Sequence, residues 1–558
     1  MIKKYLNRRV LGVSDYLFCG LLALAFTASS DYIQTGSFTS SVGYFAAAFV
    51  LFIILLLSSC FLRTCLAKSA AAEVPERGFL KFVSRVMESR FHIFIVACLI
   101  FICWLPALWF LYPGTLINDT WGELIQFIKF TAGDPVLSDH HPVFDTFLLG
   151  AMIVPFSQKT GEWHYAIFFW VLLQSFLTSL AFSCTVAFVY KKLKPGIRAV
   201  LLMILFYCLL PIYPASTQTV SKDALFSWIY VFFTVAYLEI VFSEGESLRK
   251  GWFLTGISLL SVLCCLTKKI GFYVLLPSFM LLFLFLRKNR IRLLIPTAAT
   301  VIVMFVILPF VFMKLEVQPG GQQEKYSLPF QMTARYLKDY GEDVTEEEYA
   351  VIDKVLNADI IARDYDPTWA DPVKRHYQKG TNEDYLPYLK VWFKMGFRHP
   401  DAYLAAANSM LAGWFSWTEY APLMDMEHRN QLDTQYIPKS VAIRYISEKT
   451  AASYKMMFDK LYENPFTKLF FTYGFYASIL PAFFASTVLR KGNGRKRYWL
   501  AFIPFFLSLV LGCWMAPASV HLEGMRYLYP ITYTIPLMFM WCVYIIKIDK
   551  QENKKGTY

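Results

Sequence analysis

The residues best suited to chemistry lie in a polar stretch that directly follows an apolar segment. This stretch, LYPGTLINDTWGELIQFIKFTAGDPVLSDHHPVFDTFLLG (111–150), contains Asp119 and the adjacent pair His140 and His141. A carboxylate close to the point where the chain leaves an apolar segment is partly removed from water, which raises its pKa and suits a general base. Asp119 is therefore the candidate catalytic base. The alternative is that Asp119 caps a helix beginning near Thr120.

The two histidines precede Pro142 and a short apolar run. Imidazoles at an interface can hydrogen-bond a phosphate or a sugar, or bind a divalent metal ion together with carboxylates such as Asp139 and Asp145. Adjacent side chains diverge on a helix, so we favour contact of His140 and His141 with sugar or phosphate. A divalent metal ion stays open as the alternative.

Cations form the second group. Lys222 and Asp223 lie in STQTVSKDALF (216–226), and Lys268 and Lys269 lie in TKKIG (267–271). The arrangement of the apolar segments puts these lysines on the outer face, where positive residues are disfavoured. Their natural partner is an anion at that interface, such as a lipid phosphate. The alternative is that the lysines extend from apolar surface into water.

The third group is HLEGMRYLYP (521–530), at the start of the last apolar segment. Arg526 is a planar donor suited to a phosphate or a carboxylate. The alternative is an ion pair of Arg526 with Glu523.

The elements that position these groups are membrane helices. The chain has 558 residues, of which 56% are hydrophobic and 17% charged. This composition is typical of a polytopic membrane protein and excludes a soluble multidomain protein. Apolar runs long enough to cross the hydrocarbon core predict about twelve spans. They lie near 15–33, 42–64, 91–112, 164–190, 197–214, 223–242, 252–267, 270–286, 291–313, 468–489, 498–516 and 527–546.

Basic clusters fall on alternate loops, which predicts that both termini are cytoplasmic. The clusters are Lys3 to Arg9, Arg63 to Arg90, Lys191 to Arg198, Arg249 and Lys250, Arg287 to Arg292, Arg490 to Arg497, and Lys547 to Lys555. These residues face anionic lipid, so the net charge of +13 requires no nucleic acid. The N-terminus resembles a signal peptide, but we expect an uncleaved first span.

Four regions follow from this pattern. Residues 1–90 are expected to be an N-terminal two-helix anchor with a basic cytoplasmic loop. Residues 91–313 form the catalytic membrane module with outer loop 113–163, in which Trp121 to Ile128 predict a helix flat on the membrane and 143–156 lies in the interface. Residues 314–467 carry 23 Asp and Glu against 18 Lys and Arg and predict a helical outer domain, capped at Thr345 and with Pro400 in a first helical turn. Residues 468–558 supply the last spans and a basic tail.

The chain resembles the GT-C superfamily of integral-membrane glycosyltransferases, and more closely a bacterial family of unknown function grouped with it. The residues that carry the resemblance are YPGTLINDTW, SDHHPVFDTFLLG, SKDALFSW, LTKKIGFY, SLPFQMTARY and EGMRYLYP, which cover most of 91–546 in order. The resemblance implies an all-α polytopic fold with interfacial helices in the first large outer loop. It also implies that Asp119 is the acidic catalytic residue of the first outer loop, and Arg335 of SLPFQMTARY joins the candidate substrate-binding residues. The two extra N-terminal spans depart from the superfamily pattern.

The expected activity is therefore a hexosyltransferase of the bacterial plasma membrane, active on its outer face. A polyprenyl-phosphate-linked sugar is the expected donor, and an envelope glycan, lipid or protein is the expected acceptor. Asp119 would deprotonate the acceptor hydroxyl, and the cations would neutralise the leaving phosphate. The alternatives are a lipid-linked glycan polymerase or ligase, and a transporter or flippase of an anionic lipid. A transporter should carry polar residues near mid-membrane, where only Gln174 stands out.

Overall fold

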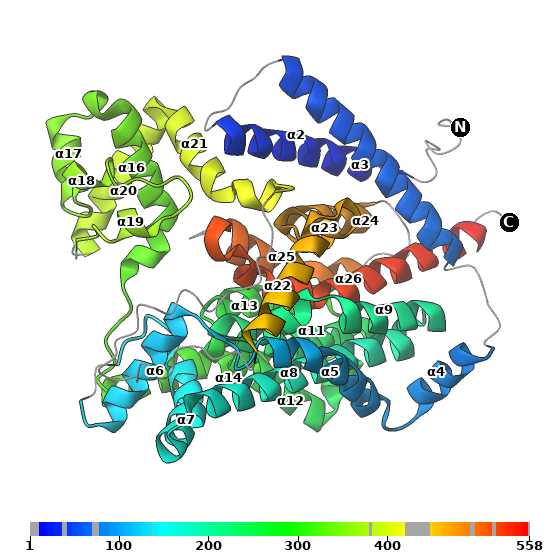
Figure 1. The fold of residues 1–558 in the computed structure, drawn as a ribbon. Helices are drawn as coiled ribbons and strands as arrows, with labels where there is room; N and C mark the ends of the chain where they lie inside the picture. The colour runs from blue at the N-terminus through cyan, green and yellow to red at the C-terminus, as the bar shows by residue number, and fades with distance from the viewer. Residues whose placement is uncertain are drawn as a thin grey trace.

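The computed structural model describes residues 11–35, 42–69, 77–134, 137–378, 382–418, 447–490, 497–515 and 520–555. The prediction of an almost all-α chain is confirmed, because two two-residue strands are the only named strands in these ranges. Figure 1 shows a bundle of long helices with a lobe of shorter helices at one end. The lobe consists of α16 (Ser327–Tyr340), α17 (Glu346–Asp353), α18 (Ala358–Ile361), α19 (Asp371–Lys374) and α20 (Asn382–Arg398), and α21 (Pro400–Leu411) leads back to the bundle.

The bundle contains the remaining α-helices. They are α2 (Val13–Thr35), α3 (Val42–Ser69), α4 (Phe79–Glu88), α5 (His92–Phe110), α6 (Asn118–Thr131), α7 (Val143–Thr160), α8 (Trp163–Phe188), α9 (Ile197–Leu209), α10 (Ile212–Thr217), α11 (Lys222–Phe242), α12 (Gly251–Thr267), α13 (Ile270–Phe285), α14 (Leu294–Ile302), α15 (Leu308–Lys314), α22 (Glu448–Glu463), α23 (Pro465–Lys468), α24 (Leu480–Leu489), α25 (Ile503–Leu509) and α26 (Val520–Lys555). The strands are β1 (Thr115–Leu116) and β2 (Thr219–Val220).

Seven helices of the described residues are long and apolar enough to cross a membrane. They are Val13–Ile33, Val42–Ala67, His92–Phe110, Trp163–Leu193, Lys222–Phe242, Arg290–Lys314 and Gly524–Asp549. Five shorter apolar helices, Ile197–Leu209, Gly251–Thr267, Ile270–Phe285, Phe475–Leu489 and Tyr498–Trp514, overlap the other five predicted spans. Each predicted apolar run is therefore a helix, and seven of them have the length of a span.

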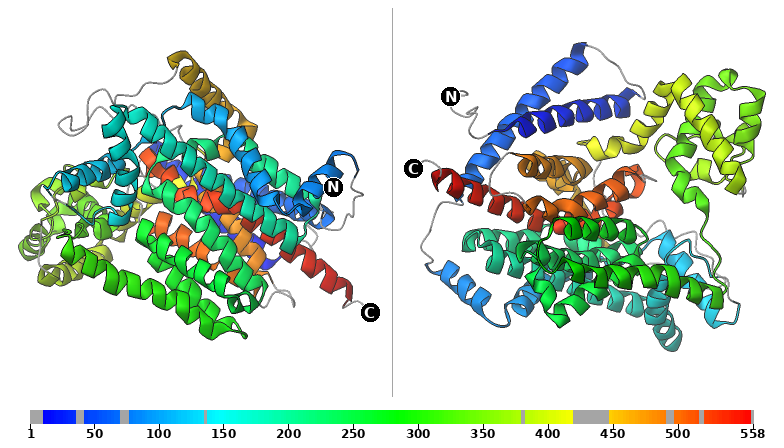
Figure 2. Two further views of the ribbon diagram at one scale, coloured as in Figure 1. Left: turned by 90° about the horizontal axis from the view of Figure 1, so that it is seen from below. Right: turned by 180° about the vertical axis from the view of Figure 1, so that it is seen from behind.

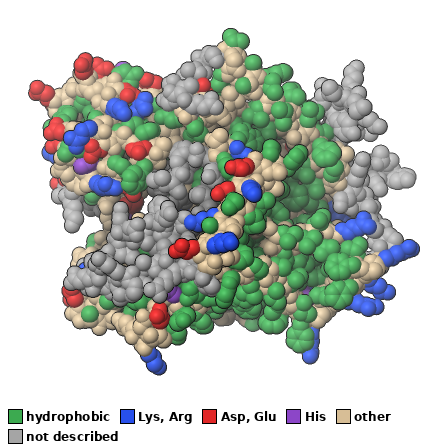
Figure 3. All heavy atoms as spheres, in the orientation of Figure 1, with side chains coloured by type: hydrophobic (Ala, Val, Ile, Leu, Met, Phe, Trp, Pro, Cys, Tyr) green, Lys and Arg blue, Asp and Glu red, His purple; other side chains and the backbone are tan. Residues whose placement is uncertain are grey.

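The surface of the bundle is apolar, as Figure 3 shows for one face. For example, the apolar residues Phe305 and Val306 are each more than 60% exposed. Helices α11 and α26 in contrast lie at the centre, and two thirds of the most apolar stretch of each helix is buried. A bundle that exposes apolar side chains outward has the surface expected for contact with lipid tails.

The two N-terminal helices are tied to the bundle by a buried ion pair. Arg63 on α3 contacts Asp15 on α2 at 2.6 Å and donates a hydrogen bond to Ser486 on α24 at 2.7 Å. The side chains of Asp15 and Arg63 are 0% and 3% exposed. Arg63 is thus not part of an exposed cytoplasmic cluster, as the sequence suggested, because the charge of Asp15 draws it into the protein. The first two helices are more than an added anchor.

The lobe has its own hydrophobic core, which extends from Phe330 to Tyr403. The predicted cap at Thr345 is confirmed as a capping box with Glu348, and Pro400 occupies the first turn of α21. Helix α22 lies outside this core, because its Tyr454 and Phe458 pack against residues of the bundle. The expected outer domain 314–467 is therefore divided between the lobe and the bundle. Figure 2 shows the lobe at the same end of the bundle from two further sides.

Helix α6 follows the predicted amphipathic stretch, but its apolar face packs inside the protein. Trp121, Leu124 and Phe127 are at most 8% exposed and belong to the main core. Helix α6 contacts α7, where Gly150 leaves room for Phe127. Since the protein interior already covers these side chains, they are not available to a membrane surface. The expectation that this apolar face rests on the membrane is wrong.

Candidate functional site

A short parallel strand pair brings Asp119 and Lys222 together. Strand β1 pairs with β2, so that Thr115 lies opposite Thr219 and Leu116 opposite Val220. Helix α6, which carries Asp119 in its first turn, begins directly after β1, and α11 begins with Lys222 directly after β2. The strand pair therefore fixes the first turns of two helices side by side, although they are about one hundred residues apart in the chain.

Gly114 and Gln174 make this strand pair feasible inside the bundle. Gly114 has φ +111°, and a Cβ at this position would lie 2.5 Å from Val171 Cγ2 and 2.8 Å from the Gln218 carbonyl oxygen. Gln174 on α8 donates hydrogen bonds through Nε2 to the carbonyl oxygens of Thr217 at 2.8 Å and of Thr219 at 3.0 Å. The polar residue that stood out within a predicted span thus satisfies backbone carbonyls next to β2.

A tight connection between α12 and α13 supplies the next cations. Gly271 lies against Cys264, because a Cβ at residue 271 would be 2.5 Å from the Cys264 carbonyl oxygen. This close approach turns the chain within two residues and leaves Lys268 and Lys269 at the tip. Lys268 contacts Asp223 at 2.5 Å, with both side chains largely buried.

Helix α26 brings in Arg526, which donates a hydrogen bond to Asp119 Oδ2 at 3.0 Å. Lys222 Nζ donates to the same oxygen at 2.9 Å. Lys222 also contacts His141 Nδ1 at 2.7 Å, so the neutral imidazole accepts from the ammonium group. Asp119 is thus the centre of a network that joins three helices and the loop before α7.

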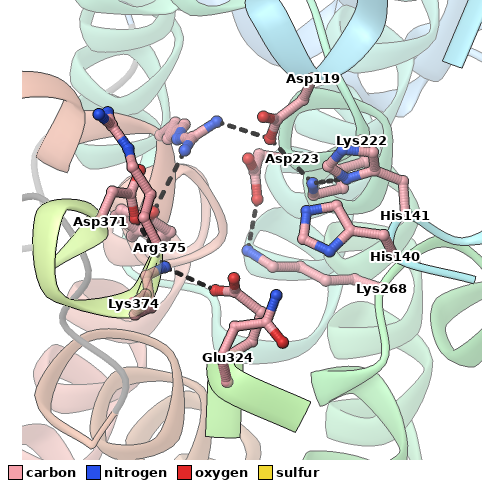
Figure 4. A pocket seen from close by; sticks show the side chains of 13 residues that line it. Asp119, His140, His141, Lys222, Asp223, Lys268, Glu324, Asp371, Lys374 and Arg375 are labelled. Atoms are coloured by element: carbon pink, nitrogen blue, oxygen red, sulfur yellow. Dashed lines mark hydrogen bonds and ion pairs between the residues drawn. The ribbon is translucent and has the colours of Figure 1, made fainter. Parts of the chain in front are cut away.

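These groups surround a cavity of about 390 Å³ (Figure 4). Its lining residues are Asp119, His140, His141, Lys222, Asp223, Lys268, Gln323, Glu324, Asp371, Lys374, Arg375, Arg526 and Tyr527. The structure therefore brings together seven of the nine candidate site residues that were predicted from the sequence. The cavity has the size of a pocket for a small organic ligand, and its lining is rich in charge.

The charge state of Asp119 differs from the prediction. Burial by itself would raise the pKa of Asp119, but the cationic groups of Lys222 and Arg526 outweigh it and hold the pKa well below its usual range. The expected raised pKa is wrong, since the sequence did not reveal that two cations lie within 3 Å. Asp119 is a stable carboxylate that can accept hydrogen bonds, and its basicity is low while Lys222 and Arg526 contact it.

His140 and His141 both line the cavity, with ring centroids 4.5 Å apart in an edge-to-face arrangement. The expected divergence does not occur, because these residues lie in a turn before α7 and not on a helix. His140 is exposed, whereas His141 is 8% exposed. Burial and the charge of Lys222 lower the pKa of His141 to about 3, so its imidazole is neutral at physiological pH.

Two further acids lie beneath the cavity, and the sequence did not single them out as a pair. Glu123, one helical turn after Asp119, is 1% exposed, and Asp145 on α7 is fully buried. Among the described residues, the carboxyl oxygens of both have no hydrogen-bond partner. Burial raises the pKa of Glu123 to about 8, and burial and the nearby Glu123 raise the pKa of Asp145 well above its usual range. Glu123 is therefore largely neutral at pH 7.

Two nominated residues do not line the cavity. Lys269 is half exposed and pairs with Asp139 at 2.8 Å, at the edge of a neighbouring recess. Arg335 on α16 pairs with Asp339 one turn later on the same helix and faces Tyr365 of the lobe. The structure thus separates Arg335 from the cations that it was grouped with.

The neighbouring recess has a volume of about 240 Å³ and is mostly apolar. Its lining residues are Asp139, Pro142, Val143, Phe144, Cys265, Leu266, Lys269, Phe272, Tyr273, Met304, Phe305, Leu308, Pro309 and Phe312. The recess adjoins the charged cavity, since Asp139 precedes His140 and Lys269 follows Lys268. A charged cavity and an apolar recess therefore lie next to each other at the same end of the bundle.

The lobe side supplies a cavity wall whose residues were not predicted from the sequence. This wall consists of Gln323, Glu324, Asp371, Lys374 and Arg375. Backbone hydrogen bonds between Gln318 and the segment of Leu137 and Asp139 hold the chain leading to the lobe beside the cavity. The only signal in the sequence was the charge-rich run DPVKR (371–375), which resembles any exposed helix end.

The acids and histidines that the structure describes are not arranged as the ligands of a metal ion. Within the described residues, no group of three or more His, Cys, Asp or Glu side chains is arranged to hold a metal ion. Ammonium and guanidinium groups occupy the positions next to Asp119 and Asp223. In this part of the chain, lysine and arginine side chains therefore balance the negative charges of the carboxylates.

Comparison with known proteins assigns the chain to a family without a known activity. A family model described as a family of unknown function, DUF6020, matches residues 131–556, which is about three quarters of the chain. No curated protein and no solved structure matches the chain. The matched range includes every cavity residue except Asp119. The chain therefore belongs to DUF6020, a family of unknown function.

Proposed function

We propose that the protein is a membrane glycosyltransferase that transfers a sugar from a polyprenyl-phosphate donor to a cell-envelope acceptor on the extracytoplasmic face. The observation that carries the proposal is the charged cavity next to an apolar recess. Lys222, Lys268 and Arg526 line the cavity. Apolar side chains of α13, of α15 and of the segment Val303–Ile307 before α15 line the recess. A donor with a phosphate head and a long apolar tail needs both environments side by side.

The proposed reaction is an inverting transfer. The acceptor hydroxyl donates a hydrogen bond to Asp119, and its oxygen attacks the anomeric carbon. The bond from that carbon to the phosphate oxygen breaks, and the polyprenyl phosphate leaves with the electron pair. The hydroxyl proton passes through Asp119 to solvent, because Asp119 keeps a proton only briefly at its lowered pKa.

The cations would stabilise the leaving group. Negative charge grows on the phosphate as the anomeric bond breaks, and fixed cations in a site sheltered from water stabilise that charge without reorganising. These cations contact Asp119 and Asp223 at 2.5–3.0 Å. A bound phosphate would share them. His140 and the neutral imidazole of His141 line the cavity, where they can hydrogen-bond the sugar or the phosphate.

The proposed topology has twelve spans with both termini in the cytoplasm and the lobe outside. It is supported by the five shorter apolar helices at the positions of the remaining predicted spans. It is also supported by the position of the lobe at the end of the bundle opposite the C-terminal end of α26 (Figure 1). We propose the bacterial plasma membrane as the location.

The test compares cells that lack the protein with cells that carry wild type, Asp119→Asn, or the matched surface control Asp134→Asn, which lies at an exposed loop position. Envelope glycans and lipid-linked sugars are analysed by mass spectrometry. We expect that deletion and Asp119→Asn remove one envelope sugar and accumulate its lipid-linked donor, whereas Asp134→Asn behaves as wild type. Full transfer by correctly inserted Asp119→Asn protein would contradict the role of Asp119, and unchanged glycans and donors after deletion would contradict the proposed function.

A polymerase or ligase that uses lipid-linked glycans shares the same substrate class. It is distinguished in the same experiment by the product, because its loss removes a whole glycan chain instead of a single sugar. A transporter is less well supported, since Gln174 serves the backbone of the strand pair and lines no cavity described above.

A further inference from the structure

The lobe-side wall of the cavity differs from the bundle side in how its charges are used. Figure 4 shows Asp371, Lys374 and Arg375 on one side of the cavity, across from His140 and Lys268. On the bundle side, each cation contacts a carboxylate. On the lobe side, one of the two cations has no such contact.

Lys374 is the cation that is already neutralised. Its ammonium group contacts Glu324 at 2.8 Å and Asp371 at 2.7 Å, and its side chain is only 8% exposed. Burial by itself would lower the pKa of Lys374, but these two carboxylates outweigh it and raise the pKa. Lys374 therefore serves to hold Glu324 and Asp371 together and has little capacity left for a ligand.

Arg375 is the cation that remains. It lines the cavity and is exposed, and within the described residues its guanidinium has no ion pair and no hydrogen bond. It lies over the ring of Trp369, 5.3 Å from the centroid. A guanidinium stacked on an aromatic ring is held in position and keeps its planar donors for a ligand.

The lining of the cavity also carries more positive than negative side chains. The lining contains five Lys and Arg side chains against four carboxylates. The buried His141 adds no charge, because burial and the charge of Lys222 lower its pKa. An excess positive charge in a cavity of this kind attracts an anion, and a planar guanidinium binds phosphate or carboxylate oxygens in pairs.

From these contacts we infer that the cavity has a second anion subsite, in which Arg375, positioned by Trp369, binds a phosphate or carboxylate group other than the phosphate held by Lys222, Lys268 and Arg526. The inference deepens the proposed function and rests on it, because it assigns the opposite wall of the same cavity. Two sources supply such a group: the second phosphate of a polyprenyl diphosphate donor, or a negatively charged acceptor.

The experiment uses the full-length protein in lipid nanodiscs. The variants are Arg375→Gln, which removes the charge, and Arg375→Lys, which keeps the charge but loses the planar pair of donors. Arg363→Gln is the matched control, because Arg363 is a highly exposed arginine of the same lobe that pairs with Asp364 outside the cavity. The probes are a polyprenyl monophosphate and a polyprenyl diphosphate of equal chain length, and inorganic phosphate added to protein saturated with the monophosphate.

If the donor supplies the second anion, Arg375→Gln weakens binding of the diphosphate about tenfold or more and leaves the monophosphate within about twofold, since a charge-assisted hydrogen bond is lost only for the former. If the acceptor supplies it, both lipids bind all variants alike, but monophosphate-loaded wild type binds inorganic phosphate and Arg375→Gln does not. Arg375→Lys lies between wild type and Arg375→Gln in either case, and Arg363→Gln equals wild type.

The inference is overturned if Arg375→Gln binds all three probes as wild type does. The outcome for the proposed function is read separately from the monophosphate. If wild type does not bind the monophosphate and Lys268→Gln changes nothing, the proposed donor site fails. In that case, inorganic phosphate binding that depends on Arg375 would still support the subsite.

Discussion

The buried acid beneath the cavity allows a sharp test of the electrostatics. Glu123 is 1% exposed, its carboxyl oxygens have no hydrogen-bond partner in the part of the chain that the structure describes, and its pKa is raised from 4.5 to about 8. Between these two pH values the folded protein holds a proton that the unfolded chain has released. The free energy of unfolding therefore falls as the pH rises from about 4.5 to about 8, and it is unaffected by this group below that range.

The magnitude follows from the size of the shift. Each pKa unit corresponds to about 1.36 kcal/mol, so a rise from 4.5 to about 8 gives a loss of about 4–5 kcal/mol across the range. Glu123→Gln keeps the shape of the side chain but cannot ionise. We expect the variant and wild type to have similar stability at pH 5, and the variant to be more stable by about 4 kcal/mol at pH 8.5.

The assay is thermal unfolding of the detergent-solubilised protein, followed by intrinsic fluorescence from pH 5 to pH 9. Lys222, Asp119 and Asp223 act on Glu123 in the wild type, and His141 lies 4.0 Å from it. Because Glu123 also raises the pKa of Asp145, the difference between the two curves reports Glu123 together with its effect on Asp145. The control is Glu347→Gln, since Glu347 is an exposed residue of the lobe and should show no pH-dependent difference. The reasoning is refuted if the Tm difference between Glu123→Gln and wild type is constant with pH, or if wild type is the more stable protein at pH 8.5.

Three further predictions test the elements that position the site. Lys268→Met leaves the buried carboxylate of Asp223 without its cation and is expected to lower the free energy of unfolding by about 3–5 kcal/mol. Lys269→Met, at a half-exposed position, is expected to lower it by less than about 1 kcal/mol. Denaturant titration of both variants checks this contrast, and equal losses would contradict it. Gly114→Ala places a Cβ at φ +111° within 2.5 Å of a neighbouring side chain and should disrupt the strand pair, which is measured as faster hydrogen exchange at β1 and β2; unchanged exchange would show that the pair tolerates a side chain. Thr345→Ala removes the cap of α17 and should destabilise the lobe by about 1 kcal/mol, measured by the susceptibility of the lobe to a protease, with Thr345→Ser expected to restore it.

Local patterns predicted the helical elements well. The twelve apolar runs, the cap at Thr345 and the Pro400 helix start depend on composition and on neighbours in the chain, and all of them correspond to helices in the structure. The strand pair of β1 and β2 was not predicted. Two residues are too short for a periodic pattern, and their hydrogen-bond partners are about one hundred residues away.

The site was predicted in part. Asp119 and the lysines expected on the outer face were found because an acid beside an apolar segment and positive residues in an expected outer loop are unusual in themselves. The charge state of Asp119 was missed, since it depends on Lys222 and Arg526, which lie 103 and 407 residues away in the chain. Arg335 was placed in the site by its motif, yet it pairs with Asp339 within its own helix.

What the sequence determined by itself is the class of protein and the identity of most charged groups at one end of it, because apolar length and the side of a charge are local properties. Only the tertiary structure decided which of these groups meet. It placed Lys222 and Arg526 on Asp119, buried Glu123 below it, and brought Arg375 from the lobe to the opposite wall. Coulomb interactions and desolvation depend on distances of a few ångström and on burial, and these arise only when segments far apart in the chain pack together.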